Sequence, residues 1–294
     1  MTRTDWMLLL TLSVLWGGSF FFVEVALSAL PALSIVWLRV GLAAAILGLI
    51  LRIGGQPFPP LVAWPALLVM GFVNNAVPFT LFALAQGHIT GALASVLNAT
   101  TPLFAVLVAH VATRDERITL AKAAGLGLGF AGVVVMLSGS AFDGMALAKA
   151  ACLAAALSYA FAGVWGRRFR RLGVAPLQTA FGQVAASSVM LAPVWLRVDR
   201  PWELAWPGAE VALAVLGLAC LSTVLAYVLY FRLLASAGAT NLLLVTFLIP
   251  VSATLLGWMV LGERLLPQHL LGFGLVAFGL LALDGKVLNR MFEK

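Results

Sequence analysis

Long apolar runs recur along the whole chain, separated by short polar or Pro/Gly-rich stretches. A helix needs roughly 20 apolar residues to cross the hydrocarbon core of a membrane. Of the 294 residues, 63% are hydrophobic and 10% are charged, whereas an ordinary soluble domain is about half apolar and about a quarter charged. A water-soluble fold could not bury this much apolar surface, so the sequence predicts an all-α integral membrane protein.

The runs are long enough and frequent enough to predict ten transmembrane helices. The first run is longer than the apolar part of a signal peptide, which has roughly 7 to 15 residues, so we interpret it as a span. The predicted spans are residues 6–28, 33–52, 62–85, 91–112, 119–138, 146–166, 177–196, 210–233, 239–261 and 268–287.

The distribution of Lys and Arg predicts that both termini are cytoplasmic, because basic residues accumulate on that side. With this orientation, 13 basic residues face the cytoplasm and 4 face outward, while Arg39 lies within a span. We therefore interpret the net charge of +7 as a topology signal in a bacterial inner membrane, without nucleic-acid binding. The outward set is Lys149, Arg197, Arg200 and Arg264.

The two halves of the chain contain similar elements in the same order. Pro102 aligns with Pro250 at an offset of 148, and Glu116-Arg117 aligns with Glu263-Arg264 at an offset of 147. This predicts two five-helix repeats, residues 1–139 and 140–294, within one membrane domain. Because five is odd, the second repeat would be inverted, an arrangement that places a substrate site at the midplane and permits alternating access.

Several of these motifs also resemble a known family. The segment WGGSF at 16–20, Arg39, the prolines of spans four and nine and GERL at 262–265 are similar to the EamA branch of the drug/metabolite transporter superfamily. The first half has DERI at 115–118 in place of GERL. The resemblance implies a ten-helix carrier that exports amino acids or related metabolites, and it is strongest to the YddG-type exporters of aromatic amino acids.

Two charges inside the predicted spans are candidate functional residues, because ionisable groups are costly in a membrane. Glu24 and Arg39 lie near the outer ends of consecutive antiparallel spans, at similar depth. They could therefore pair. The pair could form an outer gate or contact a substrate charge, or it could be a static ion pair that fixes the helical hairpin.

Polar residues near the midplane are candidates for substrate binding. They could offer donors and acceptors to a zwitterion, or they could serve only in hydrogen bonding between helices. In spans three and four they are Asn74, Asn75, Asn98 and Thr101. In the second half they are Ser158, Tyr159, Ser222, Thr223, Tyr227, Tyr230, Thr246 and Ser252.

Aromatic side chains could complete a mainly apolar cavity with few polar groups, as small-molecule sites usually have. Trp16, Phe20, Phe79 and Trp165 are the candidates. Such a lining would suit an aromatic or aliphatic substrate. Ordinary packing is the alternative for each residue.

The sequence indicates a small-molecule carrier that works without cofactors, metal ions or ATP. It contains no GxxxxGK[ST] phosphate loop and no metal-ligand spacing, and both cysteines fall in apolar runs. No Asp or Glu lies near the centre of a span, which favours gradient-driven transport or exchange. A channel or a membrane-embedded enzyme acting on lipid-linked substrates remains the alternative. The basic cluster at 167–171 is interpreted first as a topology determinant and second as a contact for anionic membrane lipid.

Glycines are frequent in spans five and ten. They are Gly125, Gly127, Gly129 and Gly132 in the first, and Gly272, Gly274 and Gly279 in the second. Closely spaced glycines allow helix backbones to approach each other. They could pack the two repeats together or form the face of a homodimer.

Overall fold

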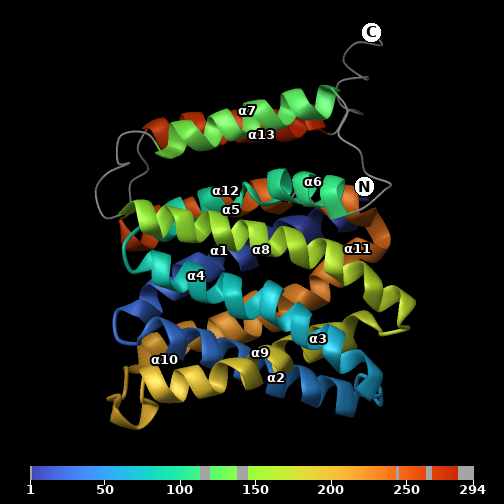
Figure 1. Ribbon diagram of the computed structural model, residues 1–294. Coiled ribbons are helices and arrows are strands. Elements are labelled where there is room, and N and C mark those ends of the chain that lie inside the picture. Colours follow the sequence, from blue (N-terminus) through green and yellow to red (C-terminus); the bar gives the residue numbers. More distant parts are fainter. Residues whose placement is uncertain (1, 113–119, 138–144, 243–244, 263–266, 284–294) are drawn as a thin grey trace.

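In a computed structural model, helices occupy each of the ranges predicted to span the membrane (Figure 1). The structure describes residues 2–112, 120–137, 145–242, 245–262 and 267–283, and within these ranges it contains no strand. The elements are α1 (Arg3–Leu27), α2 (Ala32–Ile53), η1 (Leu61–Ala63), α3 (Trp64–Gly71), η2 (Phe72–Ala76), α4 (Val77–Gln86), α5 (Gly91–Asn98), α6 (Thr101–Ala112), α7 (Leu120–Leu137), α8 (Met145–Arg171), α9 (Pro176–Val198), η3 (Pro201–Glu203), α10 (Ala209–Ala219), η4 (Cys220–Leu225), α11 (Ala226–Leu242), α12 (Val245–Leu256), η5 (Gly257–Leu261) and α13 (Pro267–Leu283).

Seven helical segments of the described chain are long and apolar enough to cross a membrane. Two shorter apolar helices, Leu248–Leu261 and Leu270–Gly279, accompany them. Many large apolar side chains are exposed, among them Ile53, Leu61 and Phe278, as expected for surfaces that face lipid. The protein is therefore a multi-pass membrane protein, and the full set of ten spans is taken up below as a proposal.

Local sequence explains where several helices begin and break. Thr2 and Asp5 form a capping box that starts α1. Between α5 and α6 the fourth segment breaks just before Pro102, because proline has no N–H and clashes with the carbonyl of the preceding turn. The hydroxyl of Thr101 donates to the freed carbonyl of Asn98, at 2.7 Å.

Two predicted connections are wrong in detail. The loop expected at 234–238 is helical, and α11 continues to Leu242, because this stretch has no proline and contains several good helix formers. The basic cluster Arg167–Arg171 was expected in a loop but forms the last turns of α8. Arginine favours a helix, and positive charge is stabilising at a helix C-terminus.

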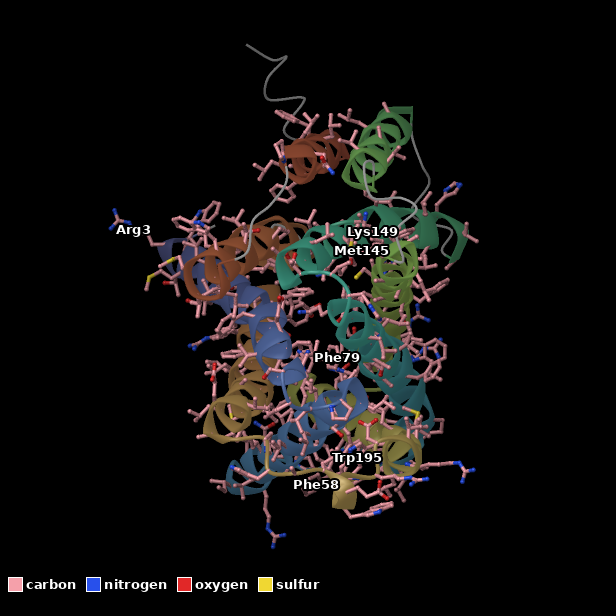
Figure 2. All side chains as sticks on the ribbon, turned by 90° about the vertical axis from the view of Figure 1, so that its left-hand side faces the viewer. Arg3, Phe58, Phe79, Met145, Lys149 and Trp195 are labelled. Atoms are coloured by element: carbon pink, nitrogen blue, oxygen red, sulfur yellow. The ribbon has the colours of Figure 1, made fainter. Side chains whose placement is uncertain are left out.

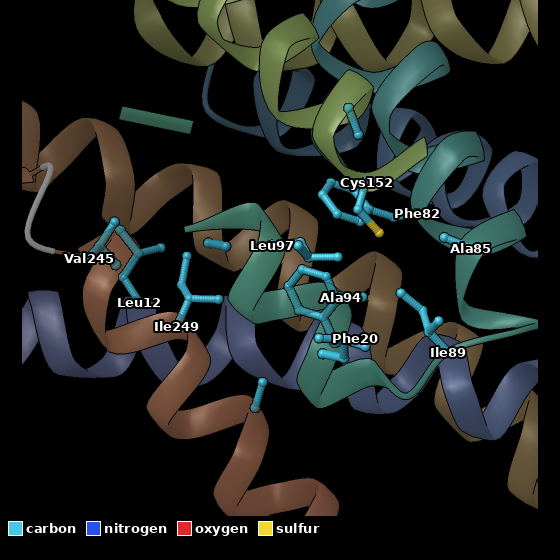
Figure 3. Close-up of a cluster of buried hydrophobic side chains, with 14 of the residues drawn as sticks. Leu12, Phe20, Phe82, Ala85, Ile89, Ala94, Leu97, Cys152, Val245 and Ile249 are labelled. Carbon is cyan, nitrogen blue, oxygen red and sulfur yellow. The ribbon is translucent and has the colours of Figure 1, made fainter. Parts of the chain in front are cut away.

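The helices form layers, with the α7–α13 pair at one end of the molecule and α2, α9 and α10 at the other (Figure 1). Two buried apolar clusters fill the interior between these ends. The first joins α1, α4, α5, α8, α11 and α12 (Figure 3), and the second joins α1, α2, α4, α9, α10 and α11. Tyr159 of α8 packs against both clusters, so the region around it connects the two halves of the core.

Helices α2 and α9 run antiparallel and are joined at both ends. At one end, the backbone N–H and hydroxyl of Ser34 donate to the Asp199 carboxylate, at 2.6 and 2.7 Å. Near it, the indoles of Trp37 and Trp195 stack with ring centroids 3.7 Å apart. At the other end, the Gln178 amide donates to the carbonyl of Pro57, at 2.8 Å. The N-terminus of each helix thus lies beside the C-terminus of the other.

Glycines pack α13 directly onto α7. A Cβ atom at Gly279 would lie 2.6 Å from both the Gly125 carbonyl oxygen and the Gly129 nitrogen. These three glycines are buried and are used for packing within one chain. Of the two roles expected for these glycines, the structure thus shows packing between the two spans. The three glycines do not support a homodimer.

Candidate functional site

Two π-helical turns interrupt the third and eighth helical segments near their middles. The first, η2, lies directly before Pro78, which cannot donate to the carbonyl four residues earlier. In the second, η4, the Thr223 hydroxyl donates to the carbonyl of Leu218 five residues back, at 2.8 Å. Short π turns of this kind occur often at functional sites. Asn75 is 0% exposed and Thr223 is 1% exposed, so both turns place polar groups in the interior.

Each of these turns supplies a side chain that bonds a helix of the other half of the chain. The Asn75 amide nitrogen donates to the Tyr227 hydroxyl at 2.8 Å, and Arg39 Nε donates to the Thr223 hydroxyl at 3.0 Å. The Arg39 guanidinium carbon lies 3.7 Å from the centroid of the Phe79 ring, and Figure 2 shows Phe79 near the middle of the bundle. We call Arg39, Asn75, Phe79, Thr223 and Tyr227 the central cluster.

Further aromatic and amide groups surround the central cluster. Tyr159 stacks with Phe82 at a centroid distance of 6.2 Å, and Trp16 contacts Tyr230 at 5.7 Å. The Asn74 amide donates to the side-chain carbonyl of Gln183, at 2.8 Å. The structure thus brings Asn75, Phe79, Tyr159 and Tyr227 together, while Trp16 and Asn74 contact other neighbours.

Other candidate hydroxyls donate to main-chain carbonyls of neighbouring helices. Ser158 donates to Val73 at 2.6 Å, Ser222 donates to Leu15 at 2.7 Å, and Ser252 donates to Ser13 at 2.7 Å. These bonds match the alternative of hydrogen bonding between helices.

The remaining candidates have other surroundings. Thr101 also contacts the Asn98 side chain, at 3.2 Å, across the α5–α6 break, while Thr246 lies partly buried in α12. Trp165 lies near the end of α8, where its indole N–H donates to the Ala66 carbonyl at 3.0 Å and Arg168 covers its ring. The described contacts therefore do not gather all the predicted residues around one cavity.

The two charged candidates have separate neighbours. The Glu24 carboxylate accepts from the backbone N–H of Gly91 at 2.6 Å, at the start of α5, where helix N–H groups favour a negative charge. The contacts described for Arg39 are those with Thr223 and Phe79. A direct ion pair between Glu24 and Arg39 is not among these contacts. The outer gate that such a pair could form stays a prediction.

The cavities described in the structure lie away from the central cluster. One of about 700 Å³ is lined by Pro193, Arg197 and Trp202, at the C-terminal end of α9. Another of about 180 Å³ lies between α5, α12 and α13. In this conformation the central cluster is enclosed by its neighbours. Among the described residues, no group of three or more His, Cys, Asp and Glu side chains could hold a metal ion.

Several polar groups of the site went unnoticed in the sequence. Gln183 and Gln86 are 2% and 7% exposed inside spanning helices, and their polarity within apolar runs is the signal that identified Asn74. Among the residues that the structure describes, three buried side-chain oxygens have no hydrogen-bond partner: Asn75 Oδ1, Thr80 Oγ1 and Gln86 Oε1. Burying an acceptor without a partner is unfavourable, which makes these atoms candidates for contact with water or a ligand.

Comparisons with known proteins find similarity to membrane transporters. The model of the EamA-like transporter family matches residues 5–138 and again residues 147–283. The chain is 26% identical over 256 residues to the uncharacterized inner membrane transporter YedA of Escherichia coli K12, covering 87% of this chain and 82% of YedA. It is 24% identical over 265 residues to an uncharacterized transporter of Archaeoglobus fulgidus, covering 88% and 90%. The chain also matches a protein of known crystal structure over 100% of both chains, with a TM-score of 0.70 and 20% identity. This match shows a shared fold.

Proposed function

Because the chain belongs to the EamA-like transporter family and its relatives are transporters rather than enzymes, we propose that it is a secondary carrier with a midplane substrate site. Its substrates would be amino acids, chiefly aromatic or hydrophobic ones, or related small metabolites. It would export them by alternating access, in which the site opens to one side of the membrane at a time. The YddG-like specificity for aromatic amino acids is part of this proposal.

Two related halves support the proposed mechanism. The same family model matches each half separately. The turns η2 and η4 begin at Phe72 and Cys220, and 220 minus 72 gives 148, the offset that separates Pro102 from Pro250. The helical order then makes α9 the counterpart of α2, and the antiparallel contacts of Ser34 with Asp199 and of Gln178 with Pro57 support an inverted second half.

The pattern of helix contacts across the halves supports the same symmetry. Helix α1 packs on α12, and its counterpart α8 packs on α6. Likewise α1 packs on α10 and α11, while α8 packs on α3 and α4. With ten spans arranged in this way, both termini lie on one side, and the distribution of Lys and Arg favours the cytoplasm. YedA is an inner membrane transporter, and we propose the same location here.

The observation that carries the proposal is that each of the two π turns bonds a helix of the other half of the chain. Asn75 of η2 donates to Tyr227 of α11, and Thr223 of η4 accepts from Arg39 of α2. A carrier of this kind has interrupted helices at its substrate site, where the irregular backbone is tolerated because it lines the binding region. The rings of Phe79, Phe82 and Tyr159 would give the site an apolar wall that suits an aromatic or aliphatic substrate.

Counterflow in liposomes tests the proposal. Purified protein is reconstituted with unlabelled amino acids inside, and uptake of a labelled panel is followed from outside. A carrier predicts transient, saturable accumulation of at least one amino acid. Uptake that never saturates would indicate a pore, and turnover of a lipid-linked substrate without solute movement would indicate an enzyme.

A matched pair of variants locates the site in the same assay. Tyr159→Ala removes a ring beside the central cluster, whereas Trp202→Ala removes an exposed ring from η3, outside the central cluster. We expect the first variant to raise the half-saturating concentration at least tenfold and the second to leave it unchanged. Equal effects would contradict the proposed location.

A further inference from the structure

Arg39 is a buried cation whose described neighbours are all uncharged or weakly acidic. Its side chain is 7% exposed, and its contacts are the Thr223 hydroxyl and the Phe79 ring. The phenols of Tyr159 and Tyr227 are ionisable groups near it. None of these neighbours is an anion at neutral pH, because tyrosine ionises near pH 10.

The described carboxylates with assigned contacts are engaged elsewhere. Asp5 accepts from Thr2 and Ser236, and Glu24 accepts from Gly91. The carboxylates of Asp199 and Glu203 contact Ser34 and Arg200 respectively. Arg39 therefore lies in the interior without a described counter-charge, an arrangement that is costly in a membrane unless an anion completes it.

The hydrogen bond described for Arg39 also leaves the terminal donors of the guanidinium without an assigned acceptor. Nε donates to Thr223, and the described contacts assign no acceptor to the two terminal nitrogens. Together these nitrogens present parallel N–H groups that match a carboxylate. Asn75, also of the central cluster, bonds Tyr227 through its nitrogen while its oxygen Oδ1 is buried without a partner, so the central cluster contains an unused acceptor as well as an unused donor pair.

We infer that the central cluster is an anion site in which Arg39 binds the carboxylate of the transported molecule. Asn75 Oδ1 accepts a hydrogen bond from a donor on the same molecule. This inference rests on the proposed carrier function and narrows its substrate class to organic carboxylates, excluding simple amines and uncharged solutes. The Phe79 ring, stacked on the guanidinium, holds its plane in a fixed orientation.

Three probes that differ in one group each test the inference. They are L-phenylalanine, phenethylamine, which lacks the carboxylate, and 3-phenylpropanoate, which lacks the ammonium. Binding to the purified protein in nanodiscs is measured by calorimetry and by the shift of the thermal unfolding midpoint. We expect the two carboxylates to bind and phenethylamine to bind at least about 100-fold more weakly, since a guanidinium left without its anion loses a charge-assisted bidentate contact.

Variants assign the effect to Arg39. Arg39→Gln should weaken binding of both carboxylates at least about 100-fold, and Arg39→Lys should retain part of the affinity, because it keeps the charge but loses the fork. Arg197→Gln makes the same substitution at an exposed position of α9 and should change nothing. If Arg39→Gln does not fold, the comparison of Arg39→Lys with wild type decides.

Two outcomes would overturn the anion site: binding of phenethylamine as tight as that of 3-phenylpropanoate, or carboxylate affinity within twofold of wild type in the Arg39 variants. Failure of wild type to bind either carboxylate would also overturn it. The result for the carrier proposal is separate. Carboxylate binding without counterflow contradicts transport alone, whereas unchanged counterflow in Arg39→Gln contradicts the anion site alone.

Discussion

Polar side chains inside the spanning helices fall into two groups according to where their hydrogen bonds go. Ser158, Ser222 and Ser252 donate to main-chain carbonyls of adjacent helices, so they stabilise packing. Asn75 and Tyr227 instead bond each other across the halves. Both groups have the same signature in the sequence, a polar residue within an apolar run. The sequence therefore predicted the candidates, but it could not assign partners, because these depend on how the helices rotate against each other.

The bond between Asn75 and Tyr227 should contribute measurably to stability. Tyr227→Phe leaves the Asn75 amide without a partner in the interior and should cost about 0.5 to 2 kcal/mol of unfolding free energy. Asn75→Leu combined with Tyr227→Phe should cost less than the sum of the two single changes. Unfolding midpoints in one detergent check this, and additive losses would show that the bond carries no coupling.

Neighbouring glycines of α1 provide a second test at the residue scale. A Cβ at Gly17 would lie 2.8 Å from the Ala253 nitrogen and 3.0 Å from the Ile249 carbonyl oxygen, whereas at Gly18 its nearest neighbour is 3.7 Å away. Gly17→Ala should destabilise the protein by about 1 to 3 kcal/mol through overpacking. Gly18→Ala should be neutral or slightly stabilising. Equal thermal midpoints for the two variants would contradict the close approach of α1 to α12.

At the scale of elements, the position of each helix could be predicted because apolar length alone fixes it. The interruptions within the helical segments could not be predicted in this way. The break between α5 and α6 falls at Pro102, inside a run expected as one span, and the π turn at 220–225 has no proline and depends on a hydroxyl bond from Thr223 to Leu218. The prediction of a loop at 234–238 was wrong for a similar reason. Polar residues and glycine indicate a turn only where the helix does not continue through them.

The pairing of α7 with α13 predicts a strong effect of one methyl group. Gly279→Ala would place a Cβ against the backbone of α7, 2.6 Å from Gly129 nitrogen, whereas a Cβ at Gly274 of the same helix meets no atom within 4 Å. We expect a loss of about 1 to 3 kcal/mol for Gly279→Ala and no loss for Gly274→Ala. Thermal unfolding of the two variants decides, and an undisturbed Gly279→Ala protein would mean that the helices are not in contact there.

At the scale of the whole molecule, two junctions hold the halves together, α2 with α9 at one end and α7 with α13 at the other. The central cluster lies between them, at the point where both π turns face inward. The duplication stays a proposal, which the sequence indicated through a few matched residues such as Pro102 and Pro250. The sequence could not predict that the site is enclosed, or that Glu24 and Arg39 have separate partners. Both features follow from the tertiary packing of one conformation.

Alternating access predicts that the centre of the protein communicates with both sides of the membrane in turn. The most direct measurement uses Asn75→Cys in a background of Cys152→Ala and Cys220→Ala, with a cysteine at the exposed Leu61 position as a one-sided control. In sealed vesicles of known orientation, a membrane-impermeant thiol reagent should label position 75 from either side, and labelling from one side should block labelling from the other. Labelling from one side only, or from neither, would contradict a midplane site that opens alternately between two inverted halves.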